Sequence, residues 1–407
     1  MWHDWLMVLF FGVAFIVTTL VYPHILDYAR RHGILDNPNA RKLQRVPVPV
    51  MGGTAVFIGF LISLIFSYFF IQEDKLFIIL GLLSVMYAIG VWDDSRNLSP
   101  ELRLLVEILT VWCIMIFLNI KIDHFHGLFG LTTISNIISI PLSIFAGVGI
   151  INAINMIDGV DGYCSTYGVM TCGVFAFIFY YSGDATMLTI ALINIGALIP
   201  FFFHNVFGLK SKMFLGDGGS LMLGTLLTIF VFNTLSSTSP CRWIENRDLS
   251  PIALCLSIMA VPIFDTLKVM SYRIKRGKSP FRPDKTHLHH LFIDMDFSHI
   301  FTSGIIVFYN LIIVIVLLLS WRLGASVEVQ LLIVVFMAML LTWGFYFFMV
   351  SRQRQNDGQG SEFFRKCCSG SRRTQFGQTK GWKAVTRIMD SRFLGGKSEQ
   401  QSDSTQA

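Results

Sequence analysis

The chain has 407 residues, of which 53% are hydrophobic and only 14% are charged, and its net charge is +6. Soluble domains carry roughly 25% charged residues, so this composition excludes an ordinary soluble protein and predicts a polytopic membrane protein. The seven cysteines are scattered, mostly inside apolar runs, and their spacing predicts neither a disulfide framework nor a zinc site.

Apolar runs long enough to cross a bilayer predict an all-α fold with about eleven transmembrane helices. They lie near residues 5–22, 50–71, 76–92, 102–120, 134–151, 163–182, 187–203, 220–235, 251–272, 301–319 and 329–350. Lys and Arg gather in alternate loops and in the C-terminal segment, and such loops stay in the cytoplasm. The N-terminus is therefore expected in the periplasm and the C-terminus in the cytoplasm.

Two parts differ in composition. Residues 1–350 are predicted to form a membrane-embedded domain whose polar loops face the cytoplasm. Residues 351–407 are rich in Gly, Ser and Gln and carry an excess of Lys and Arg. That pattern predicts a disordered basic tail attracted to anionic lipid heads, in which residues 382–393 could form a short surface helix.

A polar motif ends the fifth apolar run, at residues 152–162, which read Asn-Ala-Ile-Asn-Met-Ile-Asp-Gly-Val-Asp-Gly. On a helix, Asn152, Asn155 and Asp158 share one face, and Asp161 follows in a glycine-rich turn. Polar groups at membrane depth are costly unless they have partners or a function, so the motif predicts a ligand site. The alternative is a helix terminus with an Asx turn; a calcium loop lacks the required spacing.

Adjacent carboxylates end the third run, at Asp93 and Asp94. Because like charges repel, such a pair favours a bound cation or a raised pKa, as in metal binding or proton transfer. The alternative is a solvated loop.

A single carboxylate, Asp217, stands among three glycines at the start of the eighth run. Free amides at a helix start attract anions, and the carboxylate can bind a metal. The alternative is a simple helix cap.

The long loop before the tenth run places six cations beside His287, His289 and His290. This combination suits a diphosphate or an anionic lipid head, with imidazoles for hydrogen bonding or proton transfer. The tendency of Lys and Arg to stay on the cytoplasmic side of a membrane explains these cations nearly as well. Alternatively, the histidines could bind zinc. In the first loop, Arg45 precedes a segment stiffened by Pro47 and Pro49, which leads to a glycine pair at the start of the second run, and Arg45 is a second candidate for phosphate binding.

Taken together, Asp93-Asp94, the 152–162 motif, Phe214-Leu-Gly-Asp-Gly-Gly-Ser220 and His287-Leu-His-His290 resemble the polyprenyl-phosphate N-acetylhexosamine-1-phosphate transferases. The resemblance covers about residues 1–350 and is to the WecA branch rather than the MraY branch. It implies transfer of a sugar 1-phosphate, GlcNAc first among the candidates, from a UDP-sugar to undecaprenyl phosphate, with release of UMP. The lipid-linked product would initiate synthesis of a cell-envelope polysaccharide.

The resemblance also implies roles for individual residues. Asp217 would hold Mg²⁺, with Mn²⁺ as an alternative ion. The implied catalytic residues are Asp93, Asp94, His289 and His290, and the implied substrate-binding residues are Arg45, Asn152, Asn155, Asp158, Asp161, Phe214, Arg282 and His287. A third acid that is frequent in the family's acidic motif is replaced here by Asn97, which receives no role.

The expected partners are a UDP-N-acetylhexosamine, undecaprenyl phosphate and membrane lipids, without nucleic acid; a homodimer is compatible with the packed apolar helices. The expected location is the bacterial inner membrane, with the active site facing the cytoplasm. Two other classes remain open. A transporter also uses intramembrane polar residues and broken helices, although the chain shows no related halves, and a polyprenyl phosphate or diphosphate phosphatase would need the metal but not the uridine.

Overall fold

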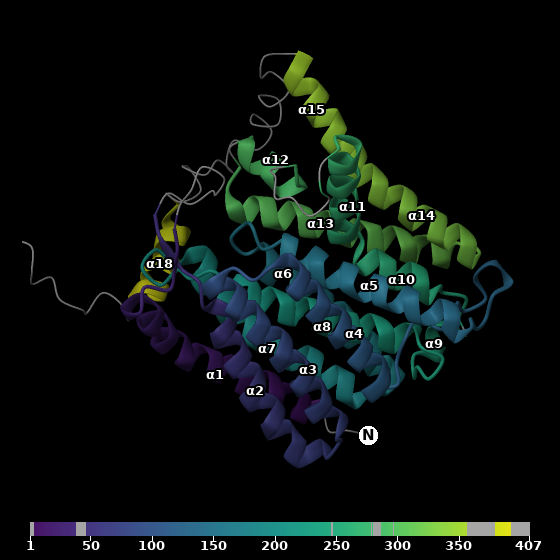
Figure 1. Ribbon diagram of the computed structural model, residues 1–407, viewed down its shortest axis with the longest axis horizontal. Helices are drawn as coiled ribbons and strands as arrows, with labels where there is room; N and C mark the ends of the chain where they lie inside the picture. The colour runs from purple at the N-terminus through teal and green to yellow at the C-terminus, as the bar shows by residue number, and fades with distance from the viewer. Residues whose placement is uncertain are drawn as a thin grey trace, which may run out of the picture.

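The computed structural model describes residues 4–37, 46–245, 247–277, 279, 286–295, 297–355 and 379–391. These residues form a bundle of long, mostly parallel or antiparallel helices (Figure 1). The helices of 16 or more residues are α1 (Asp4–Arg31), α2 (Gly52–Ile71), α3 (Lys75–Arg96), α4 (Pro100–Phe117), α5 (Asn136–Met156), α6 (Tyr163–Ser182), α7 (Ala185–Phe207), α8 (Gly216–Leu235), α11 (Ala260–Lys275) and α13 (His299–Arg322).

Shorter elements complete the described part. They are β1 (Leu35–Asp36), β2 (Val48–Pro49), η1 (Leu128–Gly130), α9 (Arg242–Glu245), α10 (Pro251–Ile258), α12 (Leu288–Asp294), α14 (Val327–Met339), η2 (Leu340–Gly344), α15 (Phe345–Gln355) and α18 (Lys380–Asp390). The two strands pair antiparallel, with Leu35 opposite Pro49. The last helices, α15 and α18, include residues of the predicted tail.

Nine helices in the described ranges are long and apolar enough to cross a membrane, and the pair α10 and α11, bent by 72°, makes up to ten. The predicted all-α, polytopic membrane class is therefore confirmed. α4 is 18 residues long but includes Glu101, Arg103 and Glu107, which separates it from the purely apolar spans. The count of eleven and the orientation remain predictions.

The helix α8 lies at the centre of the bundle, and all its residues except Asp217 are buried. It packs against α2, α3, α5, α6 and α10. Glycines make this close packing possible, as small residues do between membrane helices. A Cβ atom on Gly90 of α3 would lie 2.4 Å from backbone atoms of Asp217 and Gly218, and one on Gly224 would lie 2.8 Å from the Cα of Ile151.

Backbone hydrogen bonds tie the start of α8 to the segment before α2. The amide of Phe214 donates to the Pro49 carbonyl, and the amides of Gly52 and Gly53 donate to the carbonyls of Phe214 and Leu215, each at 2.8 Å. The start of α2 is therefore fixed beside the start of α8. Contacts described below also join the ends of α3 and α5 here, so Asp93, Asp94, the 152–162 motif and Asp217 share one end of the bundle.

The close contact between α3 and α8 predicts that Gly90→Ala is destabilising. The added methyl group would meet backbone atoms that cannot rotate away, so α3 must shift outward. We expect a melting temperature several degrees lower in detergent, by roughly the 1–3 kcal/mol that overpacking costs. The matched control is Gly81→Ala on the same helix, where a Cβ meets nothing within 4 Å. Equal melting temperatures for the two variants would contradict this packing argument.

Candidate active site

The first turn of α8 is capped by a carboxylate from α3. Asp94 accepts hydrogen bonds from the amides of Asp217, at 3.1 Å, and Gly218, at 3.3 Å. Gly216 precedes them with φ of +76°, and a Cβ there would come within 2.6 Å of the Asp94 carboxylate. A negative charge at a helix N-terminus is stabilising, so Asp94 both fixes α8 and places Asp217 at the site.

The two adjacent carboxylates predicted to act as a pair have different environments. Asp93 accepts a hydrogen bond from the Leu98 amide at 2.8 Å, and its second oxygen lies 3.3 Å from the guanidinium of Arg103. Asp94 instead faces the amides of α8. The two side chains can therefore perform separate tasks.

Arg103 of α4 lies at the centre of this cluster and was not predicted from the sequence. Its guanidinium donates to Asn155 at 2.7 Å, Glu107 at 3.1 Å and Asp93 at 3.3 Å, and it lies 3.8 Å from Asp217. A cation inside an apolar run, four residues from Glu107, is the sequence signal that would have identified it.

The two asparagines of the 152–162 motif join α5 to its neighbours. The amide nitrogen of Asn155 donates to Asp217 at 2.7 Å and to the Ser220 hydroxyl at 2.9 Å. Asn152 donates to the Glu107 carboxylate and to the Val148 carbonyl. Asn155 thus orients Asp217, whereas Asn152 orients the residue that pairs with Arg103.

Several carboxyl groups surround the single guanidinium of Arg103 in the described cluster. They are Asp93, Asp94, Glu107, Asp158 and Asp217. The Asp217 side chain is 34% exposed, so one of these carboxylates is accessible. Within the described residues, no three His, Cys, Asp or Glu side chains are grouped closely enough to enclose a metal by themselves. The arrangement fits Mg²⁺, which typically takes one or two carboxylates and completes its shell with substrate phosphates and water.

The pKa values of the two acids of the motif, Asp158 and Asp161, are shifted in opposite directions. Burial, followed by the charges of Asp217 and Asp94, raises the pKa of Asp158 well above its usual value. Burial acts in the same direction on Asp161, but His299 and Lys212 outweigh it and lower the pKa of Asp161 to about 2.

Asp161 anchors a small basic group beside the motif. Its carboxylate lies 2.6 Å from the Lys212 ammonium and 2.7 Å from Nδ1 of His299. The same ammonium lies 5.6 Å from the centroid of the Phe214 ring, and that ring is only partly buried. The sequence did not assign a role to Lys212 or His299, because each depends on a contact between distant segments.

The first histidine of the predicted three-histidine loop is engaged in a buried network. Nδ1 of His287 lies 2.9 Å from Asp265, which also pairs with Lys268 at 2.7 Å and accepts a hydrogen bond from the Leu288 amide. His287 therefore helps to fix the start of α12 on α11.

The second histidine contacts the motif directly. A Cβ on Gly159 would lie only 3.0 Å from Nε2 of His289, and the His290 ring is centred 4.4 Å from the His289 ring. Burial, then the charges of His290 and His287, lowers the pKa of His289 well below its usual value. His289 thus presents a neutral imidazole to the 152–162 loop. Arg45 and Arg282 lie outside the described residues.

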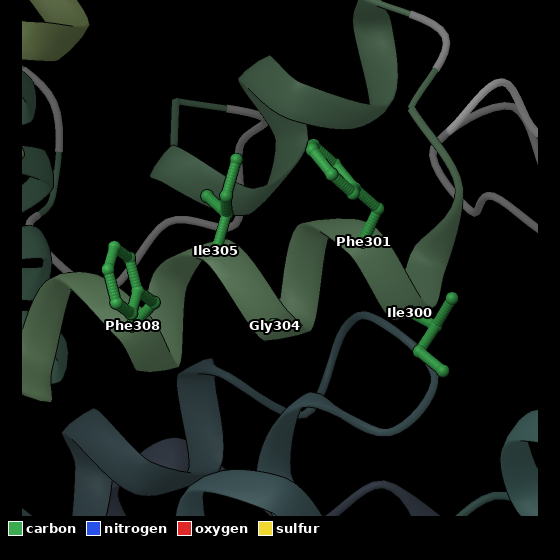
Figure 2. A pocket seen from close by; sticks show the side chains of 5 residues that line it. All are labelled: Ile300, Phe301, Gly304, Ile305 and Phe308. Atoms are coloured by element: carbon green, nitrogen blue, oxygen red, sulfur yellow. The ribbon is translucent and has the colours of Figure 1, made fainter. Parts of the chain in front are cut away.

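An apolar groove runs along the first turns of α13. Figure 2 shows its lining by Ile300, Phe301, Gly304, Ile305 and Phe308, and its volume is about 320 Å³. The groove begins one residue after His299. Its side chains suit a hydrocarbon chain and offer no group that binds a phosphate.

Comparisons with known proteins identify the family. The model of Glycosyl transferase family 4 matches residues 76–234, the stretch from α3 to α8 that supplies Asp93, Asp94, Arg103, the 152–162 motif and Asp217. The chain is 31% identical over 293 residues to the "Probable undecaprenyl-phosphate N-acetylglucosaminyl 1-phosphate transferase" of Bacillus subtilis (strain 168), covering 70% of this chain and 78% of that protein. This chain belongs to glycosyl transferase family 4. The family predicted from the four motifs is thereby confirmed.

Other relatives in the family are somewhat more distant. The chain is 28% identical to the undecaprenyl-phosphate alpha-N-acetylglucosaminyl 1-phosphate transferase of Escherichia coli (strain K12), over 70% of this chain and 76% of that protein. The protein of the same description from Yersinia pestis is 28% identical over 65% of this chain and 71% of its own length.

The lowered pKa of Asp161 predicts a stability that depends on pH. A carboxyl whose pKa is about 2 when folded and 3.8 when unfolded stabilises the fold by about 2 kcal/mol above pH 4, and loses that contribution between about pH 4 and pH 2. We expect Asp161→Asn to lower the melting temperature at pH 7, and the gap to the wild type to close over that acidic window. Asp74→Asn, at an exposed position, is the control. A gap that stays constant with pH would show that ion pairing at Asp161 does not contribute.

Proposed function

We propose that this protein transfers N-acetylglucosamine 1-phosphate from UDP-N-acetylglucosamine to undecaprenyl phosphate and releases UMP. The observation that carries the proposal is the convergence of Asp93, Asn155, Asp217 and Arg103 at the capped start of α8. The names of the relatives supply the acceptor and the sugar. The product would be a lipid-linked diphosphate sugar of the kind that initiates envelope polysaccharides.

The reaction exchanges one phosphoric anhydride for another. An oxygen of the lipid phosphate forms a bond to the sugar-bearing phosphorus of the donor, and the bond from that phosphorus to the bridging oxygen breaks, so that UMP leaves with the bridging oxygen. Such transfers depend on charge neutralisation and on in-line positioning. Mg²⁺ held by Asp217 would neutralise part of the diphosphate charge.

The residues of the chain can share the positioning. Arg103 is the guanidinium closest to Asp217 among the described contacts and can bind a phosphate oxygen. Asp93, which contacts Arg103, would orient or deprotonate the lipid phosphate. Phe214 offers a ring for uracil, and Asp161 holds Lys212 beside that ring.

The location follows from the donor and the acceptor. A UDP-sugar is soluble and a polyprenyl phosphate stays in the bilayer, so the site must be open to both. The UDP-sugar would enter at the polar ends of the helices. The groove on α13 is suited to the acceptor's hydrocarbon chain. The polar end would face the cytoplasm of a bacterial inner membrane, because among the described residues the cations Arg30, Lys210 and Lys212 gather there.

The first test measures UMP release by purified protein with UDP-GlcNAc, undecaprenyl phosphate and Mg²⁺. Wild type is expected to release UMP only when lipid and metal are both present, and Asp217→Asn is expected to lose at least two orders of magnitude in kcat. The control, Asp74→Asn, changes a carboxylate next to the opposite end of α3, roughly 30 Å from Asp94 along the helix. No UMP from folded wild type with any UDP-sugar would overturn the proposal.

The second test addresses Arg103. We expect Arg103→Gln to lower kcat by roughly 10²-fold or more, because a cluster of carboxylates then lacks its guanidinium. Arg103→Lys should be intermediate, since a lysine keeps the charge but cannot contact Asn155, Glu107 and Asp93 together. Lys121→Gln, whose lysine bonds Asn136 at the opposite end of α5 at 2.8 Å, is the control. Wild-type kcat in Arg103→Gln would remove this residue from the mechanism.

A further inference from the structure

The C-terminal helix α18 is attached to a loop beside the candidate donor site. The carboxylate of Asp390 accepts hydrogen bonds from three consecutive amides, those of Leu209 at 3.2 Å, Lys210 at 3.1 Å and Ser211 at 2.9 Å. Asp390 is only 6% exposed, so its charge is satisfied by these amides rather than by bulk water. About 180 residues separate the two partners in sequence.

One face of α18 makes this contact. Trp382, Thr386 and Asp390 recur every four residues and so lie on the same side of the helix. The Trp382 ring is centred 4.7 Å from the ring of Phe207, the last residue of α7, and Thr386 and Asp390 are buried. Thr379 caps the helix by accepting a hydrogen bond from the Trp382 amide. Figure 1 shows α18 beside the ends of α1 and α7.

The loop is held from its other side by α1. The Tyr22 hydroxyl donates to the Ser211 carbonyl at 2.8 Å, and Arg30 donates to the Lys210 carbonyl. Carbonyl groups of the loop are therefore bound by α1, and its amides by Asp390. Loss of the carboxylate would leave three neighbouring amides without this partner, which a partly buried loop tolerates poorly.

The loop leads directly into the donor side of the site. Ser211 is followed by Lys212, which pairs with Asp161 at 2.6 Å. Two residues later, Phe214 is fixed to Pro49 by its amide. A displacement of the amides at 209–211 must therefore move Lys212 relative to Phe214.

We propose that α18 is a positioning element of the donor site, in which Asp390 fixes the loop 208–212 and thereby the position of the Lys212 ammonium relative to the Phe214 ring. The role of these two groups in binding the UDP-sugar rests on the proposed function. Asp390 does not touch the reacting atoms. Its contribution is the geometry of a loop that would otherwise have several conformations.

The test compares full-length Asp390→Asn with wild type in detergent by two measurements. Hydrogen exchange of the amides at 209–211 should become at least several-fold faster in the variant, because a neutral amide accepts weaker hydrogen bonds than a carboxylate. The KM for UDP-GlcNAc should rise roughly 5- to 10-fold, while the KM for undecaprenyl phosphate stays unchanged. Asp390→Glu, which keeps the charge, should recover part of both effects.

The control is Lys383→Gln on an exposed position of the same helix, which should change neither measurement. Unchanged exchange in Asp390→Asn overturns the attachment, whatever the activity. Faster exchange with an unchanged KM for the donor overturns the positioning role. If wild type releases no UMP yet shows protection that depends on Asp390, the proposed function fails and the attachment of α18 to the loop stands.

Discussion

The site depends on how the N-terminus of α8 is satisfied. A helix leaves its first amides without intrahelical partners, and every residue of α8 except Asp217 is buried. Asp94 supplies the missing acceptor from α3. Because that carboxylate must approach closely, residues 90 and 216 have to be glycine, and α3 is drawn against α8. The same contact places Asp217 on the accessible side of the first turn. The hydrogen bonds that cap α8 therefore also assemble the site.

Much of the fold could be predicted because long apolar runs in a sequence indicate membrane-spanning helices. The long apolar runs correspond to helices, and the polar motifs interrupt them at one end, where the structure brings them together. The bend between α10 and α11 was not predicted, because the two helices form one apolar run in the sequence but meet at 72°. Apolar length measures how much chain can lie in a bilayer, and it does not report a bend between two helices.

The sequence predicted several residues of the site but not the hydrogen bonds and ion pairs that connect them. Asp93 and Asp94 read as one unit in the sequence, yet neighbouring helical positions point in different directions, one to Arg103 and the other to α8. Arg103 was missed because it stands at the very start of the predicted apolar run 102–120, where membrane orientation alone explains a cation. Its contacts with Asn155 and Asp217 join α4, α5 and α8, and no local pattern specifies such a meeting.

The charges near Asn155 and near Asp161, at the two ends of the 152–162 motif, would orient a diphosphate substrate in the proposed reaction. An excess of carboxylates surrounds Arg103 on one side, whereas Lys212 and His299 accompany Asp161 on the other. The carboxylate-rich group requires a cation before it can accept phosphate, whereas at Asp161 the Lys212 ammonium already balances the carboxylate. In the proposed reaction, the UMP part of the donor would lie toward Lys212, beside the ring of Phe214. That side is the one held by α1 from the start of the chain and by Asp390 from near its end, so its geometry is complete only when both have folded onto the loop.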